Sequence, residues 1–280
     1  MIFYLSASSN SDVEDYIIEK NMNRLFSFYS DKNRLSDYFE HPFYCVFLDS
    51  GAFSAYSKGL TLDVKPYCEY LLQHSDKYDV IAALDIIGSS EQCSAQNMEN
   101  YIYMRDNLPA SVLNKVIPTF HYGENFNQLH TICNYCDDKG GVTYIGIGGI
   151  APIKNTSIRD AFLQECFDII PSDMKVHLFG VSDLALLNKY YSRVYSADSS
   201  TWNFAAINGE LISDYGRLIV SNKRTTIDPL VSDYVKTFGY DIKVLSEDVK
   251  ERKKFNIDYL NHWLSTRTQK SNTTTQLKLF

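Results

Sequence analysis

The chain has 280 residues, of which 45% are hydrophobic and 22% are charged, and its formal net charge is −7. This composition is typical of a globular protein, and the sequence contains no uncharged apolar run approaching the roughly 20 residues that cross a membrane. The negative charge argues against a surface coated in positive charge for duplex binding. The net charge does not exclude a local basic stripe, because basic residues gather at 223–224 and 250–254. The alternative interpretation of these residues is a solvated helix face.

Cysteine usage and the first residues indicate a cytoplasmic protein. The six cysteines are scattered and do not form the framework of a small disulfide-rich domain. The N-terminal segment lacks the basic region of a signal peptide and reads as a strand. His130, Cys133 and Cys136 are the tightest group of metal-ligand types, but no second ligand pair accompanies them. We therefore expect them to pack in the core and expect no bound metal.

Strand-like and helix-like segments alternate along the chain, which is the pattern of a parallel α/β fold. We expect strands at 2–6, 44–48, 80–84, 115–120, 143–147, 175–179, 193–197 and 217–220. We expect helices at 63–75, 91–107, 125–138, 157–170, 182–191, 202–207 and 246–264. Eight strands with connecting helices favour a single-domain (β/α)8 TIM barrel over residues 1–265, with an open doubly wound sheet as the alternative. The polar segment 266–280 is expected to be a flexible tail.

Three aspartates stand where predicted strands end. Asp49 follows the second predicted strand, Asp85 the third and Asp198 the seventh. A parallel barrel gathers the carboxyl ends of its strands around one mouth, so we expect the three carboxylates to face a single pocket. The alternative for each is an N-cap of the helix that follows, since aspartate is a good capping residue.

Other strand ends carry groups suited to binding a ligand. His121 ends the fourth predicted strand, and the glycine pair Gly148-Gly149 follows the fifth, where a tight turn is the alternative role. His177 and Phe179 alternate along the sixth strand and therefore share a face; if that face is inward, Phe179 is placed to stack on a ring. Two carboxylates across a barrel mouth suit chemistry at an anomeric carbon, so the residues allow a glycosidase or a base-exchanging glycosyltransferase.

Four segments, in order, resemble the tRNA-guanine transglycosylases. Asp49-Ser50-Gly51-Ala52-Phe53 resembles their Asp-Ser-Gly-Gly-Phe motif, and Ile147-Gly148-Gly149-Ile150-Ala151 resembles their Gly-Gly-Leu-Ala segment. His177-Leu178-Phe179-Gly180-Val181 is similar to their Leu-Met-Gly-Val segment, and Asp198 stands near the position of the family nucleophile. The resemblance spans roughly residues 44–200 and implies exchange of guanine for a 7-deazaguanine base, with no cofactor.

The resemblance also implies roles for single residues. Asp198 is then the nucleophile and Asp49 the general acid/base. Asp85 reads the guanine-like base edge, and His121 replaces a glutamine that contacts the base. The remaining substrate-binding residues carried over are Ser50, Gly51, Gly148, Gly149, His177, Phe179 and Gly180.

Departures from the family point to DNA as the substrate. The Cys-x-Cys-x-x-Cys…His zinc module of the tRNA enzymes is absent, the segment after their nucleophile is replaced by 199–204, and Ser54 stands where they usually have glutamine. This compact form looks more like the DNA-modifying relatives of phages and mobile elements. We therefore expect a DNA-guanine transglycosylase in the cytoplasm of a bacterial cell, acting on DNA and a preQ0-like 7-deazaguanine. The alternatives are a tRNA transglycosylase, a DNA base glycosylase, and a catalytically silent, clamp-tethered protein that binds DNA or a queuosine precursor.

The C-terminal peptide carries a second resemblance. Gln276-Leu277-Lys278-Leu279-Phe280 resembles the Gln-Leu-x-Leu-Phe peptide with which bacterial proteins bind the replication sliding clamp. Leu277, Leu279 and Phe280 would serve as apolar anchors in a hydrophobic groove, with Gln276 as the polar start of the motif. The alternative is a tail that docks on its own barrel.

Overall fold

The chain folds into a mixed α/β structure, and the computed structural model describes residues 1–7, 10–31, 43–88, 91–221 and 228–277. Side chains are described as far as Arg267. The residues group into two compact units: unit 1 comprises Met1–Ser8 and Asn23–Ser199, and unit 2 comprises Ser9–Met22 and Ser200–Phe280. All the candidate residues at the strand ends belong to unit 1.

Unit 1 is built on one sheet of nine parallel strands in the spatial order β5-β4-β3-β2-β1-β11-β10-β9-β6. The strands are β1 (Ile2–Leu5), β2 (Asn23–Ser27), β3 (Val46–Asp49), β4 (Val80–Ala82), β5 (Val116–Ile117), β6 (Thr119–His121), β9 (Tyr144–Gly148), β10 (Lys175–Leu178) and β11 (Ser196–Ser199). Because every neighbouring pair is parallel, all nine carboxyl ends lie at the same edge of the sheet.

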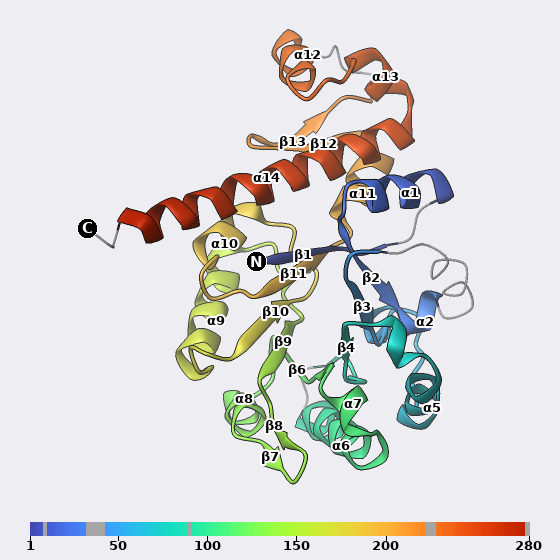
Figure 1. The fold of residues 1–280 in the computed structure, drawn as a ribbon, viewed down its shortest axis with the longest axis vertical. Helices are drawn as coiled ribbons and strands as arrows, with labels where there is room; N and C mark the ends of the chain where they lie inside the picture. The colour runs from blue at the N-terminus through green and yellow to red at the C-terminus, as the bar shows by residue number, and fades with distance from the viewer. Residues whose placement is uncertain (8–9, 32–42, 89–90, 222–227, 278–280) are drawn as a thin grey trace. The chain divides into compact units, whose positions relative to one another are not determined.

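The two edge strands of this sheet, β5 and β6, are consecutive in the chain and are separated only by Pro118. Proline has no backbone N–H and therefore interrupts a hydrogen-bonded ladder. Before the interruption, the carbonyl of Ile117 accepts a hydrogen bond from the N–H of Ala83, next to β4, at 2.8 Å. At the interruption, the carbonyl of Pro118 accepts from the N–H of Gly146 in β9, also at 2.8 Å. The sheet is therefore curled into a nearly closed barrel (Figure 1).

Alternate residues of each strand point into the barrel, because successive side chains of a strand leave opposite faces. One buried cluster joins inward side chains from five strands: Tyr4, Leu25, Phe47, Ala82 and Ile117. Asp49 lies two residues after Phe47, so the same alternation places it on the inward face. His121 lies four residues after Ile117 and therefore also faces inward. The inward face is thus apolar in the middle of the barrel and polar at its carboxyl edge.

Helices follow most of the strands, and α5, α6, α8, α9 and α10 lie outside the ring of strands (Figure 1). The helices among the described residues of unit 1 are α2 (Phe28–Asp31), α4 (Ala52–Tyr56), α5 (Val64–His74), α6 (Glu91–Asn107), α7 (Ala110–Leu113), α8 (Phe126–Cys133), α9 (Thr156–Ile169) and α10 (Leu184–Lys189), with a 3-10 turn η1 (Ser75–Lys77). Four of them are capped by side chains that accept from backbone N–H groups of the first turn: Asp63, Asn125, Asn155 and Asp183.

The structure confirms seven of the predicted strands and corrects the eighth. The segment predicted at 217–220 does form a strand, β13 (Gly216–Ile219), but it pairs antiparallel with β12 (Glu210–Ser213) in a two-stranded sheet of unit 2. Its place in the parallel sheet is taken by β2, which the sequence did not predict. The predicted helix 125–138 also ends early, because Cys136 belongs to a small hairpin of β7 (Cys136–Asp137) and β8 (Gly140–Gly141). His130 and Cys136 are exposed and Cys133 is half-buried, so the prediction that these three residues pack in the core is wrong for His130 and Cys136.

Strand β2 was missed because a charged residue stands at its second position. Arg24 is fully buried. Its guanidinium donates hydrogen bonds to the carbonyl oxygens of Leu5, the last residue of the neighbouring strand β1, and of Ala7, just beyond it. The guanidinium also lies over the Phe26 ring at 4.7 Å. The arginine therefore satisfies backbone groups at the point where the chain leaves the sheet.

Replacing this arginine is expected to destabilise the protein. Arg24→Ala leaves buried carbonyl groups without donors, and we expect the free energy of unfolding to fall by about 2–4 kcal/mol. Urea denaturation measures the change. The matched control is Lys77→Ala, which removes an exposed ion pair with Asp76 and should cost less than about 0.5 kcal/mol. Equal effects of the two substitutions would contradict this role for Arg24.

Unit 2 contains α1 (Ser11–Glu19), α11 (Thr201–Ile207), the β12–β13 hairpin, α12 (Pro229–Lys236), α13 (Ile242–Glu247) and α14 (Val249–Leu277). Helix α14 packs against α11, β12, α1 and α13. Asn256, which is fully buried on α14, donates to the carbonyl of Trp202 at 3.0 Å and accepts from Ile212 N at 2.8 Å. One side chain thus ties α14 to both α11 and β12.

The late basic residues do not form a free stripe on α14. Arg252 is buried and donates to the carbonyls of Ala206 and Leu245, each at 2.7 Å. Lys250 pairs with Asp12 and Lys254 with Glu251. The pair at 223–224 lies outside the described residues. Within the described part of the chain, no helix has the length and apolar character needed to cross a membrane.

Candidate functional site at the carboxyl edge of the barrel

The carboxyl edge of the sheet collects the site residues predicted from the sequence. Asp49, His121 and Gly148 are the last residues of β3, β6 and β9, and Asp198 lies within β11. His177 lies within β10. The others follow the ends of β3, β4, β9 and β10: Ser50, Gly51, Asp85, Gly149, Phe179 and Gly180. The C-terminal peptide is not described here, because residues 278–280 and the side chains of Gln276 and Leu277 lie outside the described part.

Asp49 is held by the turn that follows it. Its Oδ2 accepts a hydrogen bond from the backbone N–H of Gly51 at 3.0 Å. Gly51 has φ +81°, and a Cβ there would lie 2.5 Å from both Ser27 Oγ and Tyr29 Cβ, so only glycine fits. Helix α4 begins at Ala52 with Gly51 at its N-cap position, so Asp49 is not a helix cap.

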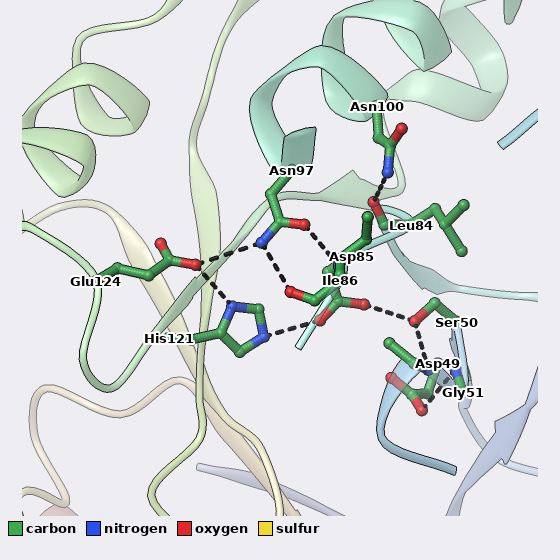
Figure 2. Close-up of polar contacts among 11 residues, drawn as sticks. Asp49, Ser50, Gly51, Leu84, Asp85, Ile86, Asn97, Asn100, His121 and Glu124 are labelled. Atoms are coloured by element: carbon green, nitrogen blue, oxygen red, sulfur yellow. Dashed lines mark hydrogen bonds and ion pairs between the residues drawn. The ribbon is translucent and has the colours of Figure 1, made fainter. Parts of the chain in front are cut away.

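A hydrogen-bonded network of side chains surrounds Asp85 (Figure 2). Asp85 Oδ1 accepts from Ser50 Oγ at 2.6 Å, and Asp85 Oδ2 lies 2.8 Å from His121 Nε2. The other ring nitrogen, His121 Nδ1, lies 3.1 Å from Glu124 Oε1, which also accepts from Asn97 Nδ2 at 3.3 Å. Asn97 in turn holds the loop after β4, since its amide bonds both the N–H and the carbonyl of Ile86.

His121 is charged in this network. The ring is buried, which by itself lowers its pKa, but the hydrogen bonds to Asp85 and Glu124 raise the pKa to about 10. Both ring nitrogens therefore carry hydrogen at neutral pH, and each donates to a carboxylate. The charged ring thus uses both N–H groups inside the network and fixes the orientation of the Asp85 carboxylate at the edge of the barrel.

Asp198 is bonded to the neighbouring strand β10 and the turn after it. Its Oδ1 accepts from the backbone N–H of Gly180 at 2.8 Å and lies 3.4 Å from His177 Nε2. The residue is only 5% exposed. Helix α11 begins at Thr201 with Ser200 at its N-cap position, so Asp198 is not a helix cap either.

The three aspartates are close enough for their charges to interact. Burial raises the pKa of Asp49 to about 8, and the negative charges of Asp85 and Asp198 raise it in the same direction. Carboxylates that repel one another in a partly desolvated site do not all ionise together near neutral pH. Asp49 is therefore poised to hold or release a proton near pH 8, which is the property of a general acid/base.

Glycines on β9 leave room for the rings at the mouth. A Cβ on Gly146 would lie 2.5 Å from the Phe179 ring, and one on Gly148 would lie 2.8 Å from the His121 ring. Phe179 faces inward beside His177, with ring centroids 4.4 Å apart. Both glycines occupy inward positions, so the absence of side chains there gives the two rings their space.

Sequence reasoning missed two members of the network and one exposed ring. Glu124 and Asn97 come from the loop after β6 and from α6, and neither stands at a strand end. The signal for Glu124 was its position three residues after His121. Phe53 lies on α4, four residues after Asp49, and is 64% exposed. The signal for Phe53 was its place in the Asp49–Phe53 motif.

Among the described residues, no three histidine, cysteine, aspartate or glutamate side chains gather in a way that would hold a metal ion. Comparison of the chain with models of known protein families and with curated proteins gives no match.

Proposed function

We propose that this protein is a DNA-guanine transglycosylase, which replaces guanine in DNA by a 7-deazaguanine base. The proposal includes the fold: β5 and β6 count as one strand interrupted by Pro118, which makes the barrel a (β/α)8 TIM barrel. The observation that carries the function is the electrostatic coupling of Asp49 with Asp198 and Asp85 at one barrel edge. An acid whose pKa is raised, beside a second carboxylate at the same site, suits exchange at a glycosidic carbon.

The Asp85–His121 pair supports a guanine-like base. Guanine presents the O6 acceptor beside the N1–H and N2–H donors, whereas adenine presents a donor at position 6 and an acceptor at N1. The charged His121 ring donates from Nε2 to the Asp85 carboxylate at 2.8 Å and so fixes that carboxylate as an acceptor. The remaining lone pairs of the Asp85 carboxylate suit the adjacent N1–H and N2–H donors of guanine and 7-deazaguanine, whereas adenine would turn its N1 acceptor toward them.

In the proposed reaction Asp198 is the nucleophile and Asp49 moves the proton. A carboxylate oxygen of Asp198 attacks C1′, the C1′–N9 bond breaks, and its electron pair passes to guanine, which takes a proton from Asp49. This leaves a covalent ester between Asp198 and C1′. After guanine departs, the 7-deazaguanine binds in its place and the Asp49 carboxylate removes its N9 proton. N9 then attacks C1′ and releases Asp198.

Exchange of labelled guanine tests the proposal. Purified protein is incubated with radiolabelled guanine and either single-stranded DNA, duplex DNA or tRNA. We expect label to enter DNA, and more readily in single strands, because flipping a base from a duplex costs a few kcal/mol. Adding unlabelled preQ0 should chase the label out. Label in tRNA alone, abasic sites without label, or binding without any exchange would each contradict the proposal in favour of a different activity.

The C-terminal peptide supports a second part of the proposal, a bacterial sliding clamp as partner. The sequence Gln276–Phe280 is the basis, since it supplies apolar anchors in the spacing of clamp-binding peptides. We expect deletion of residues 276–280 to abolish binding to an immobilised clamp while leaving exchange on short oligonucleotides unchanged. Surface plasmon resonance measures the binding, and the control is deletion of the preceding polar residues 270–274. Unchanged clamp affinity after the first deletion would refute the partnership.

A further inference from the structure

A chain of polar contacts runs along the inside of the barrel to Asp198. The phenol of Tyr144, at the start of β9, contacts Ser196 Oγ, and Ser196 Oγ lies 2.6 Å from His177 Nδ1. The opposite ring nitrogen, Nε2, lies 3.4 Å from Asp198 Oδ1. Ser196 and Asp198 share the inward face of β11, and Ser196 is in register with His177 on β10. The chain thus joins three neighbouring strands.

The His177 ring is fixed in place by aromatic neighbours. It is fully buried, and its centroid lies 4.6 Å from that of Phe47 and 4.4 Å from that of Phe179. Burial lowers the pKa of His177, although the carboxylate of Asp198 opposes this shift. The ring is therefore neutral at neutral pH and carries one N–H, unlike the cationic His121.

Hydrogen-bond directions along the chain follow from the carboxylate of Asp198. A carboxylate only accepts, so His177 Nε2 must carry the ring hydrogen and donate to it. His177 Nδ1 then only accepts, so the Ser196 hydroxyl donates to Nδ1. Because the Ser196 hydroxyl hydrogen is donated to His177, Ser196 Oγ can only accept from the Tyr144 phenol. Burial raises the pKa of Tyr144, so the phenol keeps its hydrogen and can donate it.

We propose that His177, fixed as its Nε2–H tautomer by Ser196 and Tyr144, is a positioning residue that orients Asp198 for attack. His177 Nε2 and Gly180 N both contact Oδ1. No described residue donates a hydrogen bond to Oδ2. The two donors hold the carboxylate plane and occupy one oxygen, and the other keeps its lone pairs for C1′. The assignment of the His177 tautomer does not depend on the proposed function. The role of His177 in orienting Asp198 for attack does rest on the proposed function.

Nitrogen-15 NMR of histidine-labelled protein tests the tautomer without any substrate. We expect the His177 signals, assigned by their loss in His177→Gln, to show a protonated Nε2 and an unprotonated Nδ1 that accepts a hydrogen bond. Ser196→Ala removes the donor to Nδ1 and should shift the Nδ1 resonance toward that of a free nitrogen. A protonated Nδ1 or a doubly protonated ring in the wild-type protein would overturn the inference, whether or not the protein exchanges bases.

Kinetics test the positioning role. His177→Leu should lower kcat about 10²-fold, the scale of a misplaced reacting group, with KM for the incoming base unchanged. His177→Gln, whose amide can donate to Asp198 and accept from Ser196, should recover most of this loss. A wild-type kcat for His177→Leu, or a Gln variant no better than Leu, would overturn the role. If the wild-type protein itself exchanges no base, the proposed function fails while the NMR result still decides the tautomer.

Discussion

Asp198→Asn is expected to abolish base exchange, with a loss on the order of 10⁴-fold or more. The amide that replaces the carboxylate is a poor nucleophile and cannot form the ester with C1′. Incorporation of labelled guanine into a DNA oligonucleotide measures the loss, and denaturing electrophoresis measures the protein–DNA adduct, which should disappear with it.

The asparagine variant separates chemistry from folding. Its side-chain oxygen can still accept from the Gly180 N–H, which the aspartate accepts at 2.8 Å, so the thermal unfolding midpoint should stay close to that of the wild type. The matched control is Asp160→Asn, which alters a surface carboxylate paired with Lys189 in the same unit. Exchange at the wild-type rate in Asp198→Asn would show that another group is the nucleophile.

Asp49→Asn is expected to slow exchange by about 10²–10⁴-fold, the range for loss of a general acid/base. In the wild type, Asp49 must be protonated to assist guanine departure and ionised to accept the proton of the incoming base. With the pKa of Asp49 raised to about 8 by burial and by the charges of Asp85 and Asp198, both forms coexist in mildly alkaline solution. The rate should therefore peak near pH 8, and the residual rate of Asp49→Asn should lack that peak.

The same residue gives a stability test with a definite sign. The folded protein keeps the Asp49 proton up to about pH 8, whereas an aspartate with the ordinary pKa of 3.8 loses it in the unfolded chain at much lower pH. Between these values the folded state binds more protons, so the contribution of Asp49 to stability falls as pH rises. Asp49→Asn should therefore gain stability over the wild type as pH rises, with the difference between the two growing by about 5 kcal/mol from pH 4 to pH 8.

Urea denaturation at several pH values measures this difference. Comparison of the variant with the wild type isolates Asp49, because His121 and the other titrating groups are present in both. A stability difference that stays the same from pH 4 to pH 8 would contradict the raised pKa of Asp49.

Most strands could be predicted because each is a short run of buried apolar residues that ends in a polar or glycine residue. Strand β2 escaped because Arg24 interrupts the apolar pattern, and its burial depends on carbonyls at the end of β1 that the sequence does not reveal. The eighth predicted strand was a real strand in the wrong sheet. A run of four residues carries no signal for parallel or antiparallel pairing, and β13 pairs with β12 instead.

The sequence predicts those residues of the candidate site that stand where a strand ends. Asp49, Asp85 and Asp198 were found because parallel strands bring their carboxyl ends together. The charge of His121 could not be predicted from the sequence, because it depends on Glu124 and Asp85 contacting opposite nitrogens of the ring. Sequence also gave no sign that the two inward histidines differ. His121 is held between two carboxylates, whereas His177 has one carboxylate and a serine.

Mapping the covalent intermediate tests the central proposal most directly. The protein is incubated with a guanine-containing single-stranded oligonucleotide in the absence of any incoming base, quenched in acid, digested and analysed by tandem mass spectrometry. We predict a deoxyribose-linked modification on the peptide that contains Asp198, located on that carboxylate. Exchange that proceeds with no such adduct, or with the modification on Asp49 or any other residue, would contradict it.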